Sequence, residues 1–94
     1  MGEPEFTATG VRIERWPRAL TRAGKVLIRD GRLQLLTSRD REIDSAPLGA
    51  VSAARSWLPG RGDAVARVNG RRYRLRMPAG RFVEAVRRAR AARG

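Results

Sequence analysis

Cysteine and histidine are both absent from this 94-residue chain. Without them the chain can form no disulfide, has no thiolate nucleophile and lacks the usual ligands of a structural zinc ion. The imidazole that most often serves as general acid or base near neutral pH is missing as well. Several enzyme classes are therefore excluded, and we expect a protein without catalytic activity or cofactor.

Long apolar runs are also absent. No segment approaches the roughly 20 apolar residues that a membrane-spanning helix needs. Residues 1–10 carry two acids and no apolar stretch, unlike a secretory signal peptide. The sequence predicts a cytoplasmic protein, with peripheral attachment to a membrane as the alternative location.

Basic residues dominate the charge that is present. The chain has 21 basic and 9 acidic residues, which gives a formal net charge of +12. Lys25 is the single lysine, and the arginines accompany abundant alanine and glycine, a composition that a GC-rich genome also produces by drift. Two interpretations stay open: a solvated basic surface without a charged partner, or a surface for an acidic protein, an anionic membrane or a nucleic acid.

The first quarter of the chain carries weak structural signals. We expect residues 1–10 to be a flexible leader, acidic where the rest of the chain is basic. Val11 and Ile13 alternate with polar residues, which is typical of a strand. Pro17 suits the first position of a helix, so a short helix ended by the following glycine is predicted over residues 17–23.

A clear β-hairpin signal follows. Asp-Gly at 30–31 supplies the two positive-φ residues of a type I′ turn between runs at 25–29 and 32–37. A two-residue turn pairs the residues that flank it and so assigns both faces. The predicted core face comprises Val26, Ile28, Leu33 and Leu35. The opposite, mixed face comprises Lys25, Leu27, Arg29, Arg32, Gln34 and Leu36.

Turns and prolines divide the middle of the chain into short pieces. After a turn over residues 38–41, residues 42–45 are predicted as a short strand that Pro47 ends. Residues 51–57 are predicted as a further strand, and the breakers at 58–63 indicate a loop.

A second hairpin is predicted around Asn-Gly at 69–70, with strands over 64–68 and 71–77. The turn places Ala66 opposite Tyr73, and a small residue opposite a large one suits a packed inner face.

The outer face of this second hairpin is rich in arginine. Arg67 is expected opposite Arg72, and Arg74 and Arg76 continue the row with Asp63 opposite Arg76. Like charges directly across a strand pair are destabilising. The repulsion within this row is therefore screened either by solvent and salt or by a bound partner.

An amphipathic helix is predicted over residues 78–92. Its apolar stripe comprises Phe82, Val86 and Ala89, helped by Val83 and Ala85. Arginines crowd its C-terminal half, where cations interact favourably with the helix dipole. The stripe is expected to join the core.

These elements resemble a pleckstrin-homology (PH)-like barrel, in particular the small PH-like domains found alone in bacteria. The resemblance covers residues 11–92 and is carried by Gly24 to Leu35, Ile43, Pro47-Leu48, Val51, Asn69-Gly70 and the Phe82–Val86 helix. It implies a mainly β fold with one C-terminal α-helix, in which a strongly bent antiparallel sheet or partly open barrel is capped by the helix. A single domain over residues 11–94 follows.

The resemblance also implies a binding scaffold without catalysis. Many PH domains hold phosphoinositides between basic residues of their first strands, and Lys25, Arg29 and Arg32 fall in the matching hairpin. The usual spacing of two basic residues separated by one position occurs instead on the later strand that carries Arg72 and Arg74.

Acidic residues offer little alternative chemistry. Asp40, Glu42 and Asp44 cluster near one predicted strand and two of them share a face. A hard cation prefers such oxygens, but the adjacent Arg39 and Arg41 neutralise them more simply. We expect no metal site.

The sequence therefore predicts a non-enzymatic module that docks onto an acidic protein surface or an anionic membrane. The predicted binding residues form an arginine row, a second basic patch and one apolar anchor: Arg67, Arg72, Arg74 and Arg76; Lys25, Arg29 and Arg32; and Trp57. A sequence-nonspecific nucleic-acid-binding protein is the alternative, although few aromatic residues remain for base stacking. Self-association through an exposed Leu27/Leu36 face and a domain cut from a longer chain are further alternatives.

Overall fold

The computed structural model describes residues 4–15, 17–56 and 62–93. Within them the chain forms seven β-strands, one 3-10 helix and one α-helix. The elements in chain order are β1 (Phe6–Arg15), β2 (Arg18–Arg29), β3 (Arg32–Leu36), β4 (Glu42–Pro47), η1 (Leu48–Ala50), β5 (Val51–Arg55), β6 (Asp63–Val68), β7 (Arg71–Pro78) and α1 (Ala79–Arg93).

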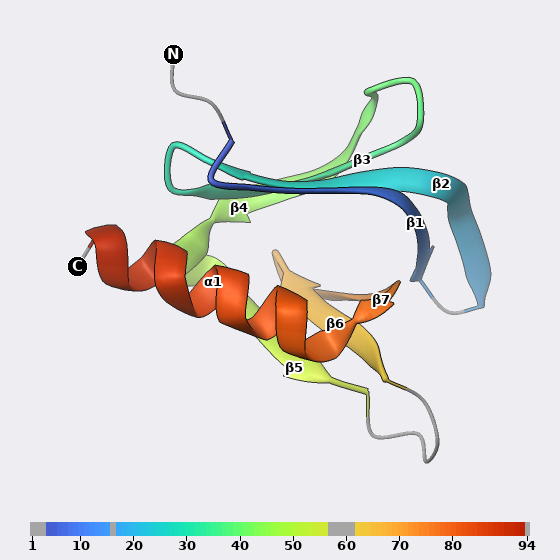
Figure 1. Cartoon of the computed structure of the whole chain (residues 1–94). Helices are drawn as coiled ribbons and strands as arrows, with labels where there is room; N and C mark the ends of the chain where they lie inside the picture. Colours follow the sequence, from blue (N-terminus) through green and yellow to red (C-terminus); the bar gives the residue numbers. More distant parts are fainter. Residues whose placement is uncertain (1–3, 16, 57–61, 94) are drawn as a thin grey trace.

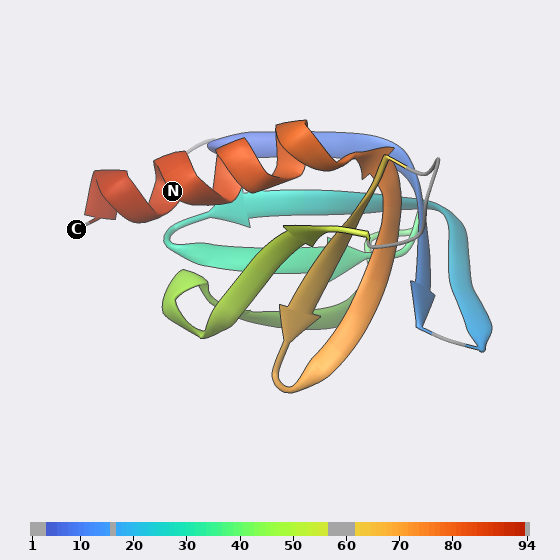
Figure 2. The same cartoon turned by 90° about the horizontal axis from the view of Figure 1, so that it is seen from below.

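The strands form one antiparallel sheet in the order β4-β3-β2-β1-β7-β6-β5. β1 and β7 pair over only two positions, Ile13 with Leu75 and Glu14 with Arg74. The sheet bends at this short junction, so that β1–β4 and β5–β7 lie as two layers (Figures 1 and 2). α1 packs mainly against β5 and β6 and also reaches β2. The predicted mainly β fold with one C-terminal helix is confirmed.

The core lies between these layers and under the helix. The predicted inner face of the first hairpin is confirmed, because Val26, Ile28, Leu33 and Leu35 are completely buried and pair in the expected register. Asp30 and its glycine neighbour have φ values of 52° and 73°, as a type I′ turn requires. Most of the largest fully buried side chains are inward-facing strand residues.

The second hairpin also has its predicted turn, with positive φ at Asn69, and Ala66 lies opposite Tyr73. One pairing was predicted wrongly: Asp63 lies opposite Pro78 and not opposite Arg76. A register shift immediately after Asp63 adds residues on the β7 side. An ideal two-residue hairpin register cannot anticipate such a bulge.

The helix predicted over residues 17–23 is wrong, because these residues belong to the β1–β2 connection and to β2. β2 pairs along its length with β1, from Arg18 opposite Arg15 to Ile28 opposite Phe6. Register shifts interrupt the ladder, so no regular alternation marks the strand in the sequence.

Two further expectations change near the start of the chain. Residues 6–10, assigned above to a flexible leader, are part of β1, where Ala8 is buried and Phe6 packs against the core. The exposed Leu27/Leu36 face is also wrong for Leu27, which is only 9% exposed. Self-association through this face therefore has little of the Leu27 side chain left to bury.

Gly24 lies in β2 where the backbone of β3 approaches closely. A Cβ atom added there would lie 2.6 Å from the carbonyl oxygen of Leu36 and 2.6 Å from Cγ2 of Thr21. We expect Gly24→Ala to lower the free energy of unfolding by about 1–3 kcal/mol, because relief requires a backbone shift. Urea denaturation measures this change, and Gly49→Ala, which meets no atom within 4 Å, is the matched control. Equal stability of the two variants would contradict the close approach.

α1 begins and ends one residue later than predicted, and its apolar stripe is buried as expected, with Phe82 fully enclosed. The guanidinium of Arg90 donates two hydrogen bonds, at 3.2 and 3.1 Å, to the carbonyl oxygen of Leu48 and ties the helix to η1. In the described part of the chain, no helix is both long enough and apolar enough to cross a membrane.

Candidate functional site: an arginine-lined groove

The outer face of β5–β7 carries a cationic row that crosses three strands. Ser52 on β5 lies opposite Arg67 on β6, and Arg67 lies opposite Arg72 on β7. All three are exposed, because the alternation that buries Val51, Val68 and Tyr73 turns these neighbours outward. This set of Ser52, Arg67 and Arg72 is called the cationic row below.

A second row runs parallel to the first, two residues further along the strands. Ala54 lies opposite Val65, Val65 lies opposite Arg74, and Arg74 lies opposite Glu14 on β1. Two residues of a strand span about 7 Å. The outer face therefore places a short apolar step beside the cationic row.

Both rows line one open groove with a volume of about 860 Å³. Six arginines and a single glutamate contribute to its lining: Arg15, Arg55, Arg67, Arg71, Arg72, Arg74 and Glu14. Pockets of roughly 300–1,000 Å³ are typical of ligand sites. The excess of guanidinium groups makes this groove an attractive site for an anion.

Arg74 is already compensated by protein carboxylates. Its Nε lies 3.4 Å from Oε1 of Glu14 and 3.2 Å from Oδ2 of Asp63, and its side chain is 28% exposed. Arg12 donates a further hydrogen bond of 2.8 Å from its Nε to Oε2 of Glu14. Arg74 therefore forms a wall of the groove. It lies in the predicted row, but its charge is already neutralised by protein carboxylates.

Arg67 and Arg72 differ from Arg74. Across residues 4–15, 17–56 and 62–93, neither guanidinium makes an ion pair. They face one another from adjacent strands and both line the groove. Within the groove, these two members of the predicted arginine row hold charge that no neighbouring described carboxylate neutralises.

Arg76 lies apart from the groove. It borders a smaller hollow of about 490 Å³ near the start of α1, together with Arg55 and Met77. The register shift after Asp63 removes the acid that the sequence placed opposite Arg76.

The second predicted patch lies on the other layer of the sheet and does not join the groove. Each of its three cations has a protein partner: Lys25 with Asp40, the Arg29 guanidinium with Oε1 of Gln34 at 3.3 Å, and the Arg32 guanidinium with Oγ of Ser45 at 3.2 Å. The predicted apolar anchor Trp57 lies outside the described residues.

Sequence reasoning missed Arg15, Arg55 and Arg71 as lining residues. Arg15 and Arg55 end their strands, where a face cannot be assigned from alternation alone. Arg71 directly follows the Asn-Gly turn. Its position at the groove depends on a contact between this hairpin and Asp44 of β4.

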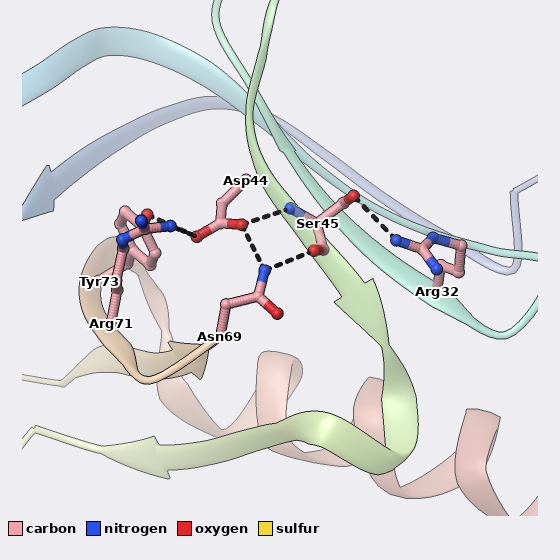
Figure 3. A network of polar contacts seen from close by, with 6 residues as sticks. All are labelled: Arg32, Asp44, Ser45, Asn69, Arg71 and Tyr73. Carbon is pink, nitrogen blue, oxygen red and sulfur yellow. Dashed lines mark hydrogen bonds and ion pairs between the residues drawn. The ribbon is translucent and has the colours of Figure 1, made fainter.

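A buried carboxylate holds that hairpin in place. Asp44 on β4 is 7% exposed and accepts hydrogen bonds at 2.7 Å from the Tyr73 hydroxyl and at 2.7 Å from the Asn69 amide (Figure 3). Its own neighbour, the backbone N–H of Ser45, donates to it at 2.9 Å, and a guanidinium nitrogen of Arg71 lies 3.5 Å away. These contacts, called the Asp44 clasp below, join β4 to the β6–β7 hairpin.

The clasp also sets the protonation of its members. Burial alone raises the pKa of Asp44, but hydrogen bonds from Tyr73, Asn69, Ser45 and Arg71 outweigh it and bring this pKa below its ordinary value. Burial and the adjacent carboxylate both raise the pKa of Tyr73. An ionised Asp44 and a neutral Tyr73 are thus the stable pair near neutral pH.

The clasp accounts for Asp44, one of the three acids that cluster in the sequence, while Asp40 pairs with Lys25. The expected neutralisers, Arg39 and Arg41, are replaced by residues from β6–β7 that lie 25 to 29 positions away from Asp44 in the sequence. Within the described ranges, no group of three or more potential ligand residues is placed to hold a metal ion.

Comparison with known proteins identifies the fold. No protein-family model matches the chain, and no curated protein sequence matches it. The crystal structure of the tandem PX–PH domains of Bem3 from Saccharomyces cerevisiae superimposes on this chain with a TM-score of 0.59 and 16% sequence identity. The match covers 89% of this chain and 40% of that one. The chain has a PH-like fold.

Two structures of Vav1 superimpose on the PH-like domain with higher scores. An apo structure of an activated truncation gives a TM-score of 0.67 at 12% identity, covering 94% of this chain and 26% of that one. A structure with an allosteric inhibitor gives 0.64 at 13% identity, covering 94% and 18%. The PH-like domain therefore spans less than half of each of these three chains, and identities this low establish the fold alone.

Proposed function

We propose that this PH-like domain is a non-enzymatic interaction module that docks onto an acidic partner through the arginine-lined groove. The observation that carries the proposal is the pair Arg67 and Arg72, which hold two uncompensated charges side by side. Retaining adjacent like charges on a sheet surface costs stability. Binding of an anionic group removes that cost and gains charge-assisted hydrogen bonds.

The partner that fits best is an acidic segment of a protein. The cations line a half-open groove, which an extended chain enters more easily than a bilayer does. A nucleic acid is disfavoured because no aromatic side chain lines the groove in the described part of the chain, whereas single-strand binding relies on stacking. The bacterial origin and the cytoplasmic location of the protein stay predictions.

The test compares two double variants that remove equal charge from the two layers of the sheet. We expect Arg67→Gln/Arg72→Gln to weaken binding of a fluorescent, glutamate-rich peptide by roughly tenfold or more, since hydrogen bonds to charged groups contribute about 1.5–3 kcal/mol. Arg29→Gln/Arg32→Gln is the matched control and should change affinity by no more than about threefold. Fluorescence anisotropy at 0.15 M salt provides the measurement, and thermal unfolding verifies the fold of both variants.

Equal losses in the two double variants would contradict a site in the groove and indicate attraction by net charge alone. Vesicles with 30% phosphatidylserine and duplex DNA form two further arms of the same assay. Tighter binding of either than of the peptide would contradict the protein partner. Arg74 is avoided as a test position because its loss leaves Glu14 and Asp63 close together without their shared cation.

A further inference from the structure

The cationic row has a geometry that a single carboxylate does not fill. Arg67 and Arg72 are directly opposite one another, and directly opposed residues of an antiparallel pair have Cβ atoms about 4.5–5.5 Å apart. Ser52 adds a hydroxyl on the other side of Arg67. Two guanidinium groups and a hydroxyl thus face the same end of the groove.

Charge matching distinguishes this row from Arg74 on the neighbouring row. At Arg74, two carboxylates already surround one guanidinium. At Arg67 and Arg72 the ratio is reversed, because two guanidinium groups have no carboxylate among the described residues. A carboxylate neutralises one of them, whereas a phosphoryl group carries about −1.5 to −2 at pH 7 and neutralises both.

We propose that Arg67 and Arg72 form a phosphoryl subsite, and that the acidic segment bound in the groove carries a phosphorylated serine or threonine. This inference rests on the proposed function and specifies its ligand. Each planar guanidinium offers paired N–H donors that match phosphate oxygens, and the Ser52 hydroxyl donates to a remaining oxygen. Arg74 stays with its own carboxylates and does not compete for the phosphoryl group.

The second row adds a requirement on the neighbouring residue of the ligand. Val65 and Ala54 form the apolar step about 7 Å from the cationic row. In an extended peptide that runs along the strands, side chains two residues apart on one face have the same spacing. An apolar side chain two positions from the phosphorylated residue therefore contacts Val65. A carboxylate at that position loses hydration against the apolar step and gains no cation of its own, because Arg74 already lies against Glu14 and Asp63.

The experiment separates phosphoryl recognition from simple charge. Two fluorescent nonapeptides of equal net charge are compared by anisotropy at 0.15 M salt: one carries phosphoserine with valine two positions later, and the other carries two adjacent glutamates in place of the phosphoserine charge. We expect the phosphopeptide to bind about tenfold or more tightly. Replacing its valine by aspartate should weaken binding by about threefold or more.

Arg72→Lys keeps the charge of the row and removes the planar fork. We expect this variant to lose most of the preference for the phosphopeptide while its affinity for the two-glutamate peptide stays within about twofold. Ser52→Ala should reduce phosphopeptide affinity by about threefold, and a side-chain NMR titration with inorganic phosphate should shift the Nε–H signals of Arg67 and Arg72 first.

The possible failures are distinguishable. Equal affinity for the two peptides, or a full preference retained in Arg72→Lys, overturns the phosphoryl subsite while acidic docking in the groove stands. Absence of binding by both peptides overturns the subsite and the proposed function together. Unchanged folding of the variants is verified by their thermal unfolding curves, so loss of structure is not mistaken for loss of the subsite.

Discussion

Replacing Asp44 by alanine should lower the free energy of unfolding by about 2–4 kcal/mol. The carboxylate is 7% exposed and accepts hydrogen bonds from Tyr73 and Asn69, which come from the opposite layer of the sheet. A buried donor that loses its acceptor costs about 1–3 kcal/mol, and the variant leaves the buried Tyr73 hydroxyl in that state. The exposed Asn69 amide loses one of its two acceptors and keeps the Ser45 carbonyl oxygen. The effect is large because one side chain closes the contact between β4 and the β6–β7 hairpin.

Urea denaturation of the variant, followed by far-UV circular dichroism, measures this loss. Glu42→Ala is the matched control, because Glu42 is an exposed acid on the same strand and should change stability by no more than about 0.5 kcal/mol. Tyr73→Phe should cost about 1–2 kcal/mol, and its effect should largely vanish when Asp44 is already alanine. Additive losses would show that the two side chains do not act together.

The pH dependence of unfolding gives a second measure of the Asp44 clasp. Because the pKa of Asp44 is lower in the folded state, its contribution is present above the unfolded value near 3.8 and is lost as the pH falls through the folded value. The pKa of Tyr73 is raised, so its contribution is present below about 10 and is lost as the pH rises. In a plot of the free energy of unfolding against pH, Asp44→Asn should reduce the decrease at acid pH. Tyr73→Phe should reduce the decrease at alkaline pH, in both cases relative to the native protein.

The turns of the two predicted hairpins and the pairings next to them were correct because their information is local. An Asp-Gly or Asn-Gly turn needs positive φ at both central residues, and both turns have it. Once the turn is fixed, the period of two assigns every following side chain to a face. The sequence alone thus predicts Arg67 opposite Arg72, and these two residues carry the proposed function.

The errors arose where pairing depends on distant residues. The β1–β2 ladder contains register shifts, so residues 18–23 show no alternation that a sequence reading can use. Asp63 moves out of register with Arg76 for the same reason. The Asp44 clasp joins β4 to β6–β7 across 25 or more positions, and no spacing rule links such residues.

The spacing of the arginines in the sequence does not tell which of them are neutralised within the protein and which are not. Arg72 and Arg74 are neighbours in the same pattern, yet only Arg74 meets Glu14 and Asp63. Glu14 reaches Arg74 because β1 pairs with β7, a contact between the first and last strands of the chain. The sheet topology therefore decides which arginines can bind an external anion.

Phe82→Ala should produce the largest loss of stability, about 3–5 kcal/mol. Phe82 is the largest of the fully buried side chains and is 0% exposed, and it lies on α1, which packs against β5 and β6. Removing the ring leaves a cavity beneath the helix in a domain whose total stability is expected to be about 5–15 kcal/mol. We expect the helix to detach first, because the remaining apolar stripe consists of small residues such as Val86 and Ala89.

Chemical denaturation and amide hydrogen exchange test this prediction together. Phe82→Leu should recover most of the loss because it refills much of the cavity, and Val83→Ala, at a half-buried position of the same helix, is the control. Exchange in β5 and β6 should accelerate in Phe82→Ala more than exchange in β2 and β3, since α1 mainly covers the former pair. A loss no greater than that of Val83→Ala would contradict an anchoring role for the ring. Faster exchange in β5 and β6, accompanied by weaker peptide binding below the unfolding midpoint, would show that the helix keeps the strands of the groove in register from the opposite face.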